Sequence, residues 1–275
     1  MIVDAFPFFQ EVELLKVRLS YLGEFVDKFI ISESEIDFAG NPKDILLTSS
    51  TISELPYSDK VTVIQNKFSV IDKRLLFPIA KKLKWRKPLW KIQLKQRNSI
   101  LPVLQTITRQ GTLLFGDLDE FPNHSKLKHL ISLTSKNHGE VYSLNQVQLV
   151  YNLRTKDSPN PWHGTIGCSI MKARKSTPNK LRKLRHNSKN TEGGWHFSYF
   201  GNKNQIQKKI RSVAPVEKHF NLSNPSLDEV SNNIKSKTNP FSKVKPDQLE
   251  ISIDEYPKEL ISCFEKFMPS ALTNS

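Results

Sequence analysis

Cysteine, glycine and long apolar runs are scarce in this sequence of 275 residues, and each scarcity excludes a class of protein. The two cysteines, Cys168 and Cys263, stand at no metal-ligand spacing, which excludes a disulfide-rich scaffold and a structural zinc module. The ten glycines form neither a GxGxxG nor a GxxxxGK phosphate loop. No run reaches the ~18 apolar residues of a membrane span, and the N-terminus has neither the basic start nor the cleavage site of a signal peptide. We therefore expect a cytoplasmic protein.

Acidic residues are few compared with basic ones. Lysine plus arginine total 41 and aspartate plus glutamate 27, which gives a formal net charge of +14. Segments 81–97 and 172–189 each contain eight basic and no acidic residues, so the rest of the chain sums to −2. This pattern indicates nucleic acid, a nucleotide diphosphate, an anionic glycan or an anionic membrane face as a partner, with a solvated basic loop as the alternative. No nucleic-acid-binding signature accompanies the charge, so we expect no specific nucleic-acid partner.

Short apolar runs alternate with helical periodicity over the first 120 residues. Strands are predicted at 2–6, 28–32, 61–65 and 112–115, and helices at 11–22 and 91–105, with Pro102 expected to kink or end the second helix. The alternation predicts an open, largely parallel α/β sheet, and such sheets bind ligands beyond the carboxyl ends of their strands.

The pattern loosens after residue 122. Strands are predicted at 141–153 and 195–200, and helices at 205–213, 226–235 and 257–267. Residues 154–193 are polar and basic and predict a loop-rich insertion. We therefore divide the chain into a first half, 1–122, and a looser second half, 123–275, which carries this insertion and a C-terminal helix.

The sequence Asp117-Leu118-Asp119 directly follows the predicted strand 112–115. Positions i and i+2 of extended backbone point to the same side, so both carboxylates are offered together at the end of a buried strand. Two such ligands suit Mg²⁺ or Mn²⁺, which can bridge a diphosphate. Gly116 would let the backbone approach a ligand closely. An ordinary acidic turn is the alternative, because a lone Asp-x-Asp is a short motif.

Trp195 and His196 are adjacent in the sequence and form a second group of candidate binding residues. A tryptophan ring offers a platform for a sugar or base. A neutral imidazole beside two carboxylates suits Mn²⁺, which makes His196 a candidate third metal ligand, with a structural histidine as the alternative.

Other polar residues are weaker candidates. In Gln96-Arg97-Asn98 the arginine can clamp a phosphate and the amides can bind a base or a sugar hydroxyl, although the motif by itself favours an exposed polar helix face. Asp4 and Glu33 follow the first two strands, at the edge where a ligand would bind, or are surface carboxylates. Three acids of the second half can serve as a general base, and their spacing does not choose among them: Glu217, Asp157 and Glu192.

Several segments resemble glycosyltransferase family 17, whose best-known members are β-1,4-mannosyl-glycoprotein β-1,4-N-acetylglucosaminyltransferases. The matching segments are 3–11 (VDAFPFFQE) with Leu14-Leu15 and Arg18-Leu19, Ser32-Glu33-Ser34 with Phe38 and Gly40, Gln96-Arg97-Asn98, 117–122 (DLDEFP), 194–201 (GWHFSYFG), Pro240-Phe241 and 255–258 (EYPK). The similarity runs from about residue 2 to 268. Gln10 stands where the family usually has asparagine, and 214–217 (APVE) stands where Ser-His-x-Glu is expected, so only Glu217 of that block remains.

The resemblance implies a GT-A-like single domain with a Rossmann-like, mostly parallel central sheet. Residues 1–122 would bind a nucleotide sugar, and residues 123–275 would bind the acceptor. The implied activity is metal-dependent, inverting transfer of a sugar, with N-acetylglucosamine as a candidate, from a UDP-linked donor to a hydroxyl of a glycan or glycolipid. The alternative is a non-catalytic glycan- or polyanion-binding protein on a transferase-like scaffold.

The resemblance also assigns roles to residues. Asp117, Asp119 and His196 would hold Mn²⁺ or Mg²⁺. The residues expected to line the donor site are Asp4, Phe6, Glu33, Gln96, Arg97, Asn98, Asp117 and Trp195. Glu120, beside the sugar, and Glu217 are the catalytic candidates. The basic insertion would face an anionic glycan, a lipid-linked acceptor or the inner face of an anionic membrane in peripheral contact.

Overall fold

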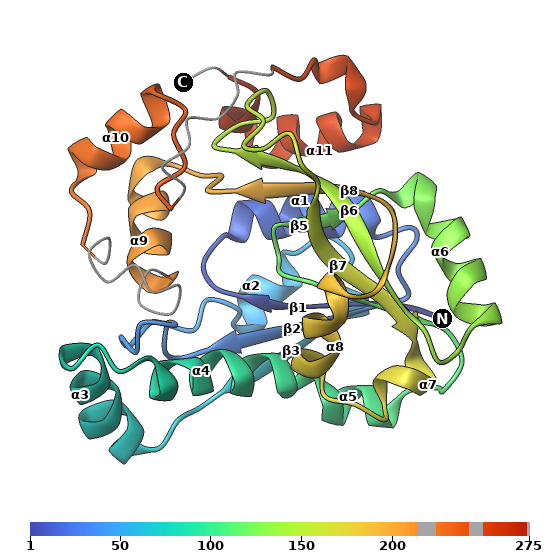
Figure 1. Ribbon diagram of the computed structural model, residues 1–275, viewed down its shortest axis with the longest axis horizontal. Coiled ribbons are helices and arrows are strands. Elements are labelled where there is room, and N and C mark those ends of the chain that lie inside the picture. Colours follow the sequence, from blue (N-terminus) through green and yellow to red (C-terminus); the bar gives the residue numbers. More distant parts are fainter. Residues whose placement is uncertain (214–223, 242–249, 274–275) are drawn as a thin grey trace.

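One eight-stranded sheet crosses the molecule in the order β3-β2-β1-β4-β7-β6-β8-β5 (Figure 1). The computed structural model describes residues 1–213, 224–241 and 250–273. The strands are β1 (Ile2–Phe8), β2 (Lys28–Ser34), β3 (Val61–Asn66), β4 (Thr112–Phe115), β5 (Glu120–Pro122), β6 (Val141–Val150), β7 (Trp162–Ser169) and β8 (Lys189–Ser198). Pairs β1–β2, β1–β4, β2–β3 and β6–β8 are parallel, and pairs β4–β7, β6–β7 and β5–β8 are antiparallel. The predicted α/β class with a mostly parallel sheet is confirmed.

Helices cover both faces of this sheet (Figure 1). They are α1 (Val12–Leu22), α2 (Ser49–Ser53), α3 (Phe77–Lys82), α4 (Arg86–Asn98), α5 (Ile100–Thr106), α6 (His124–Lys136), α7 (Ile170–Ala173), α8 (Pro178–Lys183), α9 (Lys203–Val213), α10 (Leu227–Lys235) and α11 (Lys258–Phe267). Short turns of other helix types are η1 (Ser58–Lys60), η2 (Asp72–Leu76), η3 (Leu184–His186), η5 (Ile253–Glu255) and η6 (Pro269–Leu272). No helix of the described residues has the length and apolar character needed to cross a bilayer.

Two apolar clusters hold the layers together. One lies between the sheet and the layer of α1, α6 and α11, and includes Leu15, Phe29 and Phe264. The other lies on the opposite face, where Ile100 of α5 and Ile170 of α7 pack against β1 and β4. The first and second strands are therefore buried on both faces, which explains why they appear in the sequence as continuous apolar runs rather than as alternating ones.

Most predicted elements are present, with shifted ends. The helix expected at 91–105 begins earlier, at Arg86, and is divided at Ser99 into α4 and α5. Pro102 lies in the first turn of α5, where a missing N–H costs no hydrogen bond. The loop-rich insertion expected at 154–193 is wrong, because this segment contains β7, α7, α8 and the start of β8.

The carboxyl ends of β1, β2 and β4 meet at one edge of the sheet because the three strands are parallel. The loop after β4 crosses this edge and leads into β5, which pairs with β8 through Glu120 and His196. Residues 116–120 therefore lie where the parallel half of the sheet adjoins its antiparallel half. This is the place where an open α/β sheet binds its ligands.

Candidate active site

A buried arginine holds the loop after β4 in place. Arg18 of α1 is fully buried and forms a two-point ion pair with Asp4, with both N–O distances at 2.8 Å. Its Nη1 donates to the carbonyl oxygens of Asp117, Leu118 and Glu120 at 3.2, 2.9 and 2.8 Å. Carbonyl groups in a tight turn have few partners of their own, so a single guanidinium fixes the shape of the turn.

Two residues predicted to line the donor site belong to this support instead. Asp4 is fully buried and both of its oxygens accept from Arg18. The Phe6 ring is also fully buried, and the Arg18 guanidinium lies 4.5 Å from its centre. Both residues face the interior beneath the site, and their contact with a donor stays a prediction.

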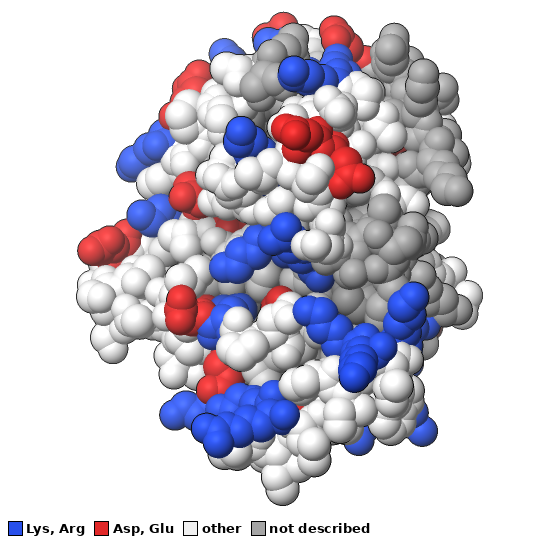
Figure 2. Space-filling view, turned by 90° about the vertical axis from the view of Figure 1, so that its left-hand side faces the viewer, with Lys and Arg blue, Asp and Glu red and all other residues white. Residues whose placement is uncertain are grey.

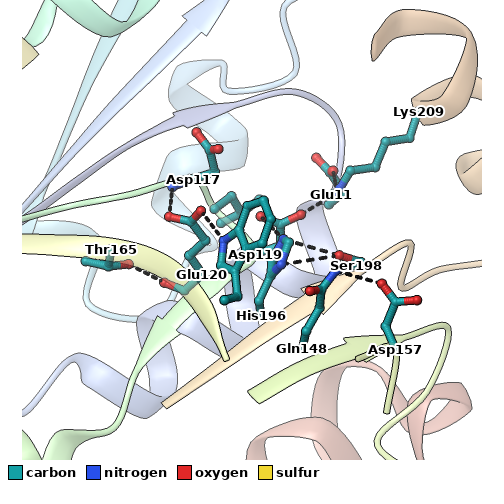
Figure 3. Close-up of polar contacts among 12 residues, drawn as sticks. Glu11, Asp117, Asp119, Glu120, Gln148, Asp157, Thr165, His196, Ser198 and Lys209 are labelled. Atoms are coloured by element: carbon teal, nitrogen blue, oxygen red, sulfur yellow. Dashed lines mark hydrogen bonds and ion pairs between the residues drawn. The ribbon is translucent and has the colours of Figure 1, made fainter. Parts of the chain in front are cut away.

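Glu120 is enclosed by donors on both carboxylate oxygens (Figure 3). Oε2 accepts from the backbone N–H of Asp117 at 3.0 Å, and Oε1 accepts from Trp162 Nε1 at 2.9 Å and Arg185 Nη1 at 3.1 Å. A Cβ on Gly116 would come within 2.6 Å of Oε2, so the glycine makes room for Glu120 and not for a ligand. Glu120 thus connects the 117–120 turn to Trp162 and Arg185, and its catalytic role stays a prediction.

Asp117 lies between two guanidinium groups. Its Oδ1 accepts from Arg97 Nη2 at 3.3 Å and its Oδ2 from Arg182. Burial alone would raise the pKa of this carboxyl, but the positive charges of Arg182 and Arg97 lower it to about 2. Burial, together with the charge of Arg182, lowers the pKa of Arg97 to about 10. Arg97 thus lies against Asp117, and its contact with a donor stays a prediction.

Asp119 points the other way, toward α9 and β8 (Figure 3). Its Oδ2 accepts from Lys209 Nζ at 2.7 Å, and its Oδ1 lies 3.6 Å from His196 Nε2. Lys209 also pairs with Glu11 at 2.9 Å. Burial would raise the pKa of Asp119, but the charges of Lys209 and His196 hold it far below its usual value. The Trp162 ring stacks on His196 with centres 4.7 Å apart.

The predicted metal site is only partly assembled. Asp119 and His196 are neighbours, whereas the Asp117 carboxylate is turned to its arginines, because residues 117–119 form a turn and not extended backbone. Among the described residues no three side chains of His, Cys, Asp or Glu are placed to hold an ion. Mg²⁺ is usually held by one or two carboxylates together with substrate phosphates, so a partial set of this chemistry still fits such an ion.

Two arginines of the site carry donors without acceptors. Arg97 Nε and Arg182 Nε are buried and have no hydrogen-bond partner among the residues that the structure describes. A buried, unsatisfied donor costs roughly 1–3 kcal/mol, and more when the group is charged. Both guanidinium groups contact Asp117 through Nη2, so the two Nε donors leave the site with hydrogen-bonding capacity for an anion.

Basic side chains pack over these groups, with Arg97 and Arg182 on Asp117 and Lys209 on Asp119. The Asp117 and Asp119 side chains are 27% and 12% exposed. A cavity of about 400 Å³ lies elsewhere, lined by residues of α5 and α7 and their flanking loops. The second basic run, 172–189, is therefore not a surface facing a glycan or a membrane over its whole length, since Arg182 and Arg185 point into the site.

Four further residues that were predicted to contact the donor have partners within the protein: Glu33, Gln96, Asn98 and Trp195. Glu33 is fully buried and accepts from Lys43 Nζ and from the N–H groups of Leu46 and Leu47.

Gln96 Nε2 donates to the carbonyl groups of Phe8 and Ser32, which ties α4 to two strand ends. Asn98 Oδ1 accepts from the N–H of Asn179 and so connects α4 to α8. The Trp195 ring lies in the core beside Tyr256, with 7% of the residue exposed. The predictions that Glu33, Gln96, Asn98 and Trp195 contact the donor are not supported by these positions.

The candidates for the general base are separated by their surroundings. Glu192 is 81% exposed and pairs with Lys126, and Glu217 lies outside the described residues. Asp157 accepts from Gln148 Nε2 at 2.6 Å and Asn239 Nδ2 at 2.7 Å through Oδ2, while its buried Oδ1 has no partner among the described residues. Burial raises the pKa of Asp157. Gln148 is paired with His196 across β6 and β8, which places Asp157 beside the site (Figure 3).

Sequence reasoning did not assign four residues of the site, Trp162, Arg182, Arg185 and Lys209. The sequence could have indicated two of them, because Arg182 and Arg185 are three positions apart and therefore lie on one face of a helical turn. Lys209 lies next to Ile210, a buried residue of amphipathic α9. Nothing local marks Trp162, whose role depends on the pairing of β6, β7 and β8.

Comparison with solved structures finds distant similarity to sugar and nucleotide enzymes. A 4-diphosphocytidyl-2C-methyl-D-erythritol synthase matches with 13% identity and a TM-score of 0.41, covering 70% of this chain and 88% of its own. The galactosyltransferase LgtC, solved with donor and acceptor sugar analogues, matches with 9% identity and a TM-score of 0.34, covering 70% and 66%. S. aureus TarS in complex with UDP-GlcNAc matches with 13% identity and a TM-score of 0.39, covering 98% and 81%. Scores below 0.5 assign no substrate to this chain.

Comparison with curated protein sequences gives no significant match. The sequence profile described as Glycosyltransferase family 17 matches residues 1–230, which is most of the chain and includes every described residue of the site except Asn239. The protein therefore belongs to glycosyltransferase family 17 and is a glycosyltransferase.

Proposed function

We propose that the protein transfers a sugar from a UDP-linked donor to a hydroxyl of a glycan or glycolipid, with inversion at the anomeric carbon. Family membership supports the class of reaction, and the donor, the acceptor and the stereochemistry are what the family resemblance implies. N-acetylglucosamine is the first sugar to test.

The observation that carries the proposal is the pair of unsatisfied guanidinium donors beside Asp117. Arg97 Nε and Arg182 Nε are buried without acceptors, and Arg185 lies on the neighbouring Glu120. Guanidinium groups bind phosphate oxygens in a planar, two-point geometry. The diphosphate of a nucleotide sugar would supply the missing acceptors, so we assign its binding to Arg97 and Arg182.

The charge balance of the site supports a divalent cation. Four carboxylates (Glu11, Asp117, Asp119 and Glu120) face four cations (Arg97, Arg182, Arg185 and Lys209). A bound diphosphate would leave this balance negative. Asp119 and His196 would hold Mn²⁺ or Mg²⁺, which would offset the charge that develops on the leaving diphosphate.

Asp157 is the described acid that best fits a general base. In an inverting displacement the acceptor oxygen forms a bond to the anomeric carbon, the bond to the diphosphate oxygen breaks, and the hydroxyl proton passes to a base. The Oδ1 of Asp157 has no partner among the described residues, and its raised pKa makes it a better proton acceptor than an ordinary aspartate. Gln148 and Asn239 orient the carboxyl through Oδ2.

Titration calorimetry with UDP, in EDTA and in MnCl₂, tests donor binding. We expect binding in MnCl₂, weaker binding in EDTA, and a further loss in Arg97→Gln. Nucleotide-sugar turnover on a panel of glycan acceptors tests transfer. Asp157→Asn should lose at least about 100-fold in kcat while keeping its affinity for UDP, because only proton transfer is removed.

Glu192→Gln is the matched control, since this exposed carboxylate pairs only with Lys126. It should keep full turnover. Glycan binding without any affinity for UDP or for other nucleotides would favour the non-catalytic binding protein instead. Full activity in Asp157→Asn would show that Asp157 is not the general base. It would not affect the assignment of donor binding to Arg97 and Arg182.

A further inference from the structure

The segment 70–87 has an exposed apolar face. Six of the eleven large apolar side chains that are exposed in the described residues lie within 70–85, with exposed fractions from 42% to 70%. Four of them recur every four residues and form what we call the apolar stripe: Ile71, Leu75, Ile79 and Leu83. Val70 and Trp85 extend it at its two ends. Single exposed apolar residues are normal on a protein surface, but a contiguous set marks an interaction site.

The opposite face of the same segment is firmly packed. Phe77 and Ala80 are buried against Leu89 and Ile92 of α4, and Phe68 lies edge-on to Phe77 with ring centres 5.6 Å apart. The helical segment therefore has a fixed orientation, and its outward face is defined by this packing. In Figure 1 α3 lies at the periphery of the molecule, beyond α4.

Basic side chains surround the apolar stripe. The exposed ones on this segment are Arg74, Lys81, Lys82, Lys84 and Lys87. The sequence contains no acidic residue from Lys73 to Gly116. Asp72, the nearest acid on the segment, accepts a hydrogen bond from Ser69. Figure 2, which faces this side of the molecule, shows Lys and Arg side chains gathered across its lower part around uncharged surface.

We propose that segment 70–87 docks on an anionic lipid bilayer. A helix with an apolar face and a lysine-rich border lies in the plane of a membrane interface, with its apolar side chains at the boundary of headgroups and acyl chains. Lysine stems can follow the apolar surface while their ammonium groups reach the headgroups. A second copy of the chain is a poor occupant, because it would bring the same positive border against this one.

The charge that indicated a membrane partner in the sequence therefore belongs, in this proposal, to the first basic run and not to the second. The inference rests on exposure and charge alone and is independent of the donor site. The proposal is for anionic phospholipid in general, because it depends on the apolar stripe and its basic border.

Flotation with lipid vesicles tests the proposal. The full chain should bind vesicles of phosphatidylcholine with 30 mol% phosphatidylglycerol and should not bind vesicles of phosphatidylcholine alone. The emission of the half-exposed Trp85 should shift to the blue on binding, and Trp85→Phe should lose that shift. The triple variant Lys82→Gln, Lys84→Gln, Lys87→Gln should bind about 100-fold more weakly at low salt, from about 1 kcal/mol per basic residue near the surface.

A second variant distinguishes the contribution of the apolar side chains to vesicle binding from that of the basic side chains. Leu75→Ser with Leu83→Ser should weaken binding at least 10-fold, whereas Leu227→Ser, at an exposed apolar residue of α10, should not. Lys128→Gln with Lys136→Gln on α6 is the control for charge. Thermal unfolding checks that each variant is folded. Equal binding to neutral and anionic vesicles, no binding, or unchanged binding in the Leu75/Leu83 variant would overturn the proposal, as would a dimer that this variant converts to monomer.

Discussion

The two basic runs of the chain have equal charge in the sequence and different surroundings in the structure. In 172–189, Arg182 and Arg185 turn inward and meet Asp117 and Glu120, with side chains only 14% and 9% exposed. In 81–97, most of the lysines are exposed, and Arg97 alone reaches Asp117. The difference lies in the available acids, because the carboxylates of 117–120 can neutralise only a few cations.

The residue types differ in the same way. The cations that enter the site from these runs are arginines, whereas the exposed positions are mostly lysines. A guanidinium is more weakly hydrated than an ammonium and can satisfy several acceptors in one plane, so burying it costs less. The position of a positive charge in the fold therefore follows from its chemistry and from the acids it can meet, and not from local charge density.

The largest effect should come from removing an interior cation outright. Arg18→Met would leave Asp4 buried without a partner and three carbonyl groups of the 117–120 turn without a donor. Breaking a buried ion pair costs about 3–5 kcal/mol. Urea unfolding at neutral pH measures the loss.

The double variant Arg18→Met, Asp4→Leu should recover part of that stability, because it removes the stranded charge. Its activity should stay low, since the turn still lacks its guanidinium. A single variant that unfolds within 0.5 kcal/mol of the wild type would show that Arg18 does not support the turn.

A smaller effect is expected inside the second basic run. Arg182→Gln removes a guanidinium from Asp117, while its neighbour Lys183 is exposed. UDP affinity should fall about 10- to 100-fold in Arg182→Gln, from roughly 1.5–3 kcal/mol for a hydrogen bond to a charged group. Lys183→Gln should change the affinity less than twofold. Titration calorimetry compares the UDP affinity of the two variants. An equal loss of affinity in both would mean that the basic run attracts UDP through its overall charge and not through Arg182.

Much of the sheet was predictable because its strands are either continuously apolar or end in a recognisable turn. β1, β2, β3 and β4 all lie within a few residues of their predicted positions. The segment 154–193 was not predictable in this way. Its strands carry polar residues such as His163 and Thr165, and Thr165 donates to the Glu120 carbonyl, so the apolar pattern that marks a strand is weakened.

The site was predictable in position but not in orientation. Adjacent residues of a strand point to opposite faces, so Trp195 and His196 of β8 cannot both line one pocket. His196 faces Asp119 and Trp195 faces the core. In the same way, Asp117 and Asp119 share a side only in extended backbone, and the turn separates them. Partners from distant segments, such as Lys209 and Arg182, decide where these carboxylates point.

The smallest effect tests the ion pair between Lys73 and Glu35, at the base of the exposed basic segment. Glu35 Oε1 accepts from the N–H of Phe68 at 2.7 Å and from Lys73 Nζ at 3.1 Å. The hydrogen bond from Phe68 and the charge of Lys73 lower the pKa of Glu35 below its ordinary value of 4.5. A depressed pKa contributes stability above the ordinary value, and this contribution is lost as the pH falls through the folded value.

Glu35→Gln should therefore cost about 0.5–1 kcal/mol at pH 7, and the difference from the wild type should shrink as the pH falls below about 4.5. Urea unfolding of both proteins between pH 7 and pH 3 measures this convergence. Glu54→Gln is the control, since Glu54 is exposed and lies on another part of the surface. A difference that stays constant with pH would mean that the carboxylate charge of Glu35 contributes nothing, and that Lys73 behaves like the exposed lysines that follow it.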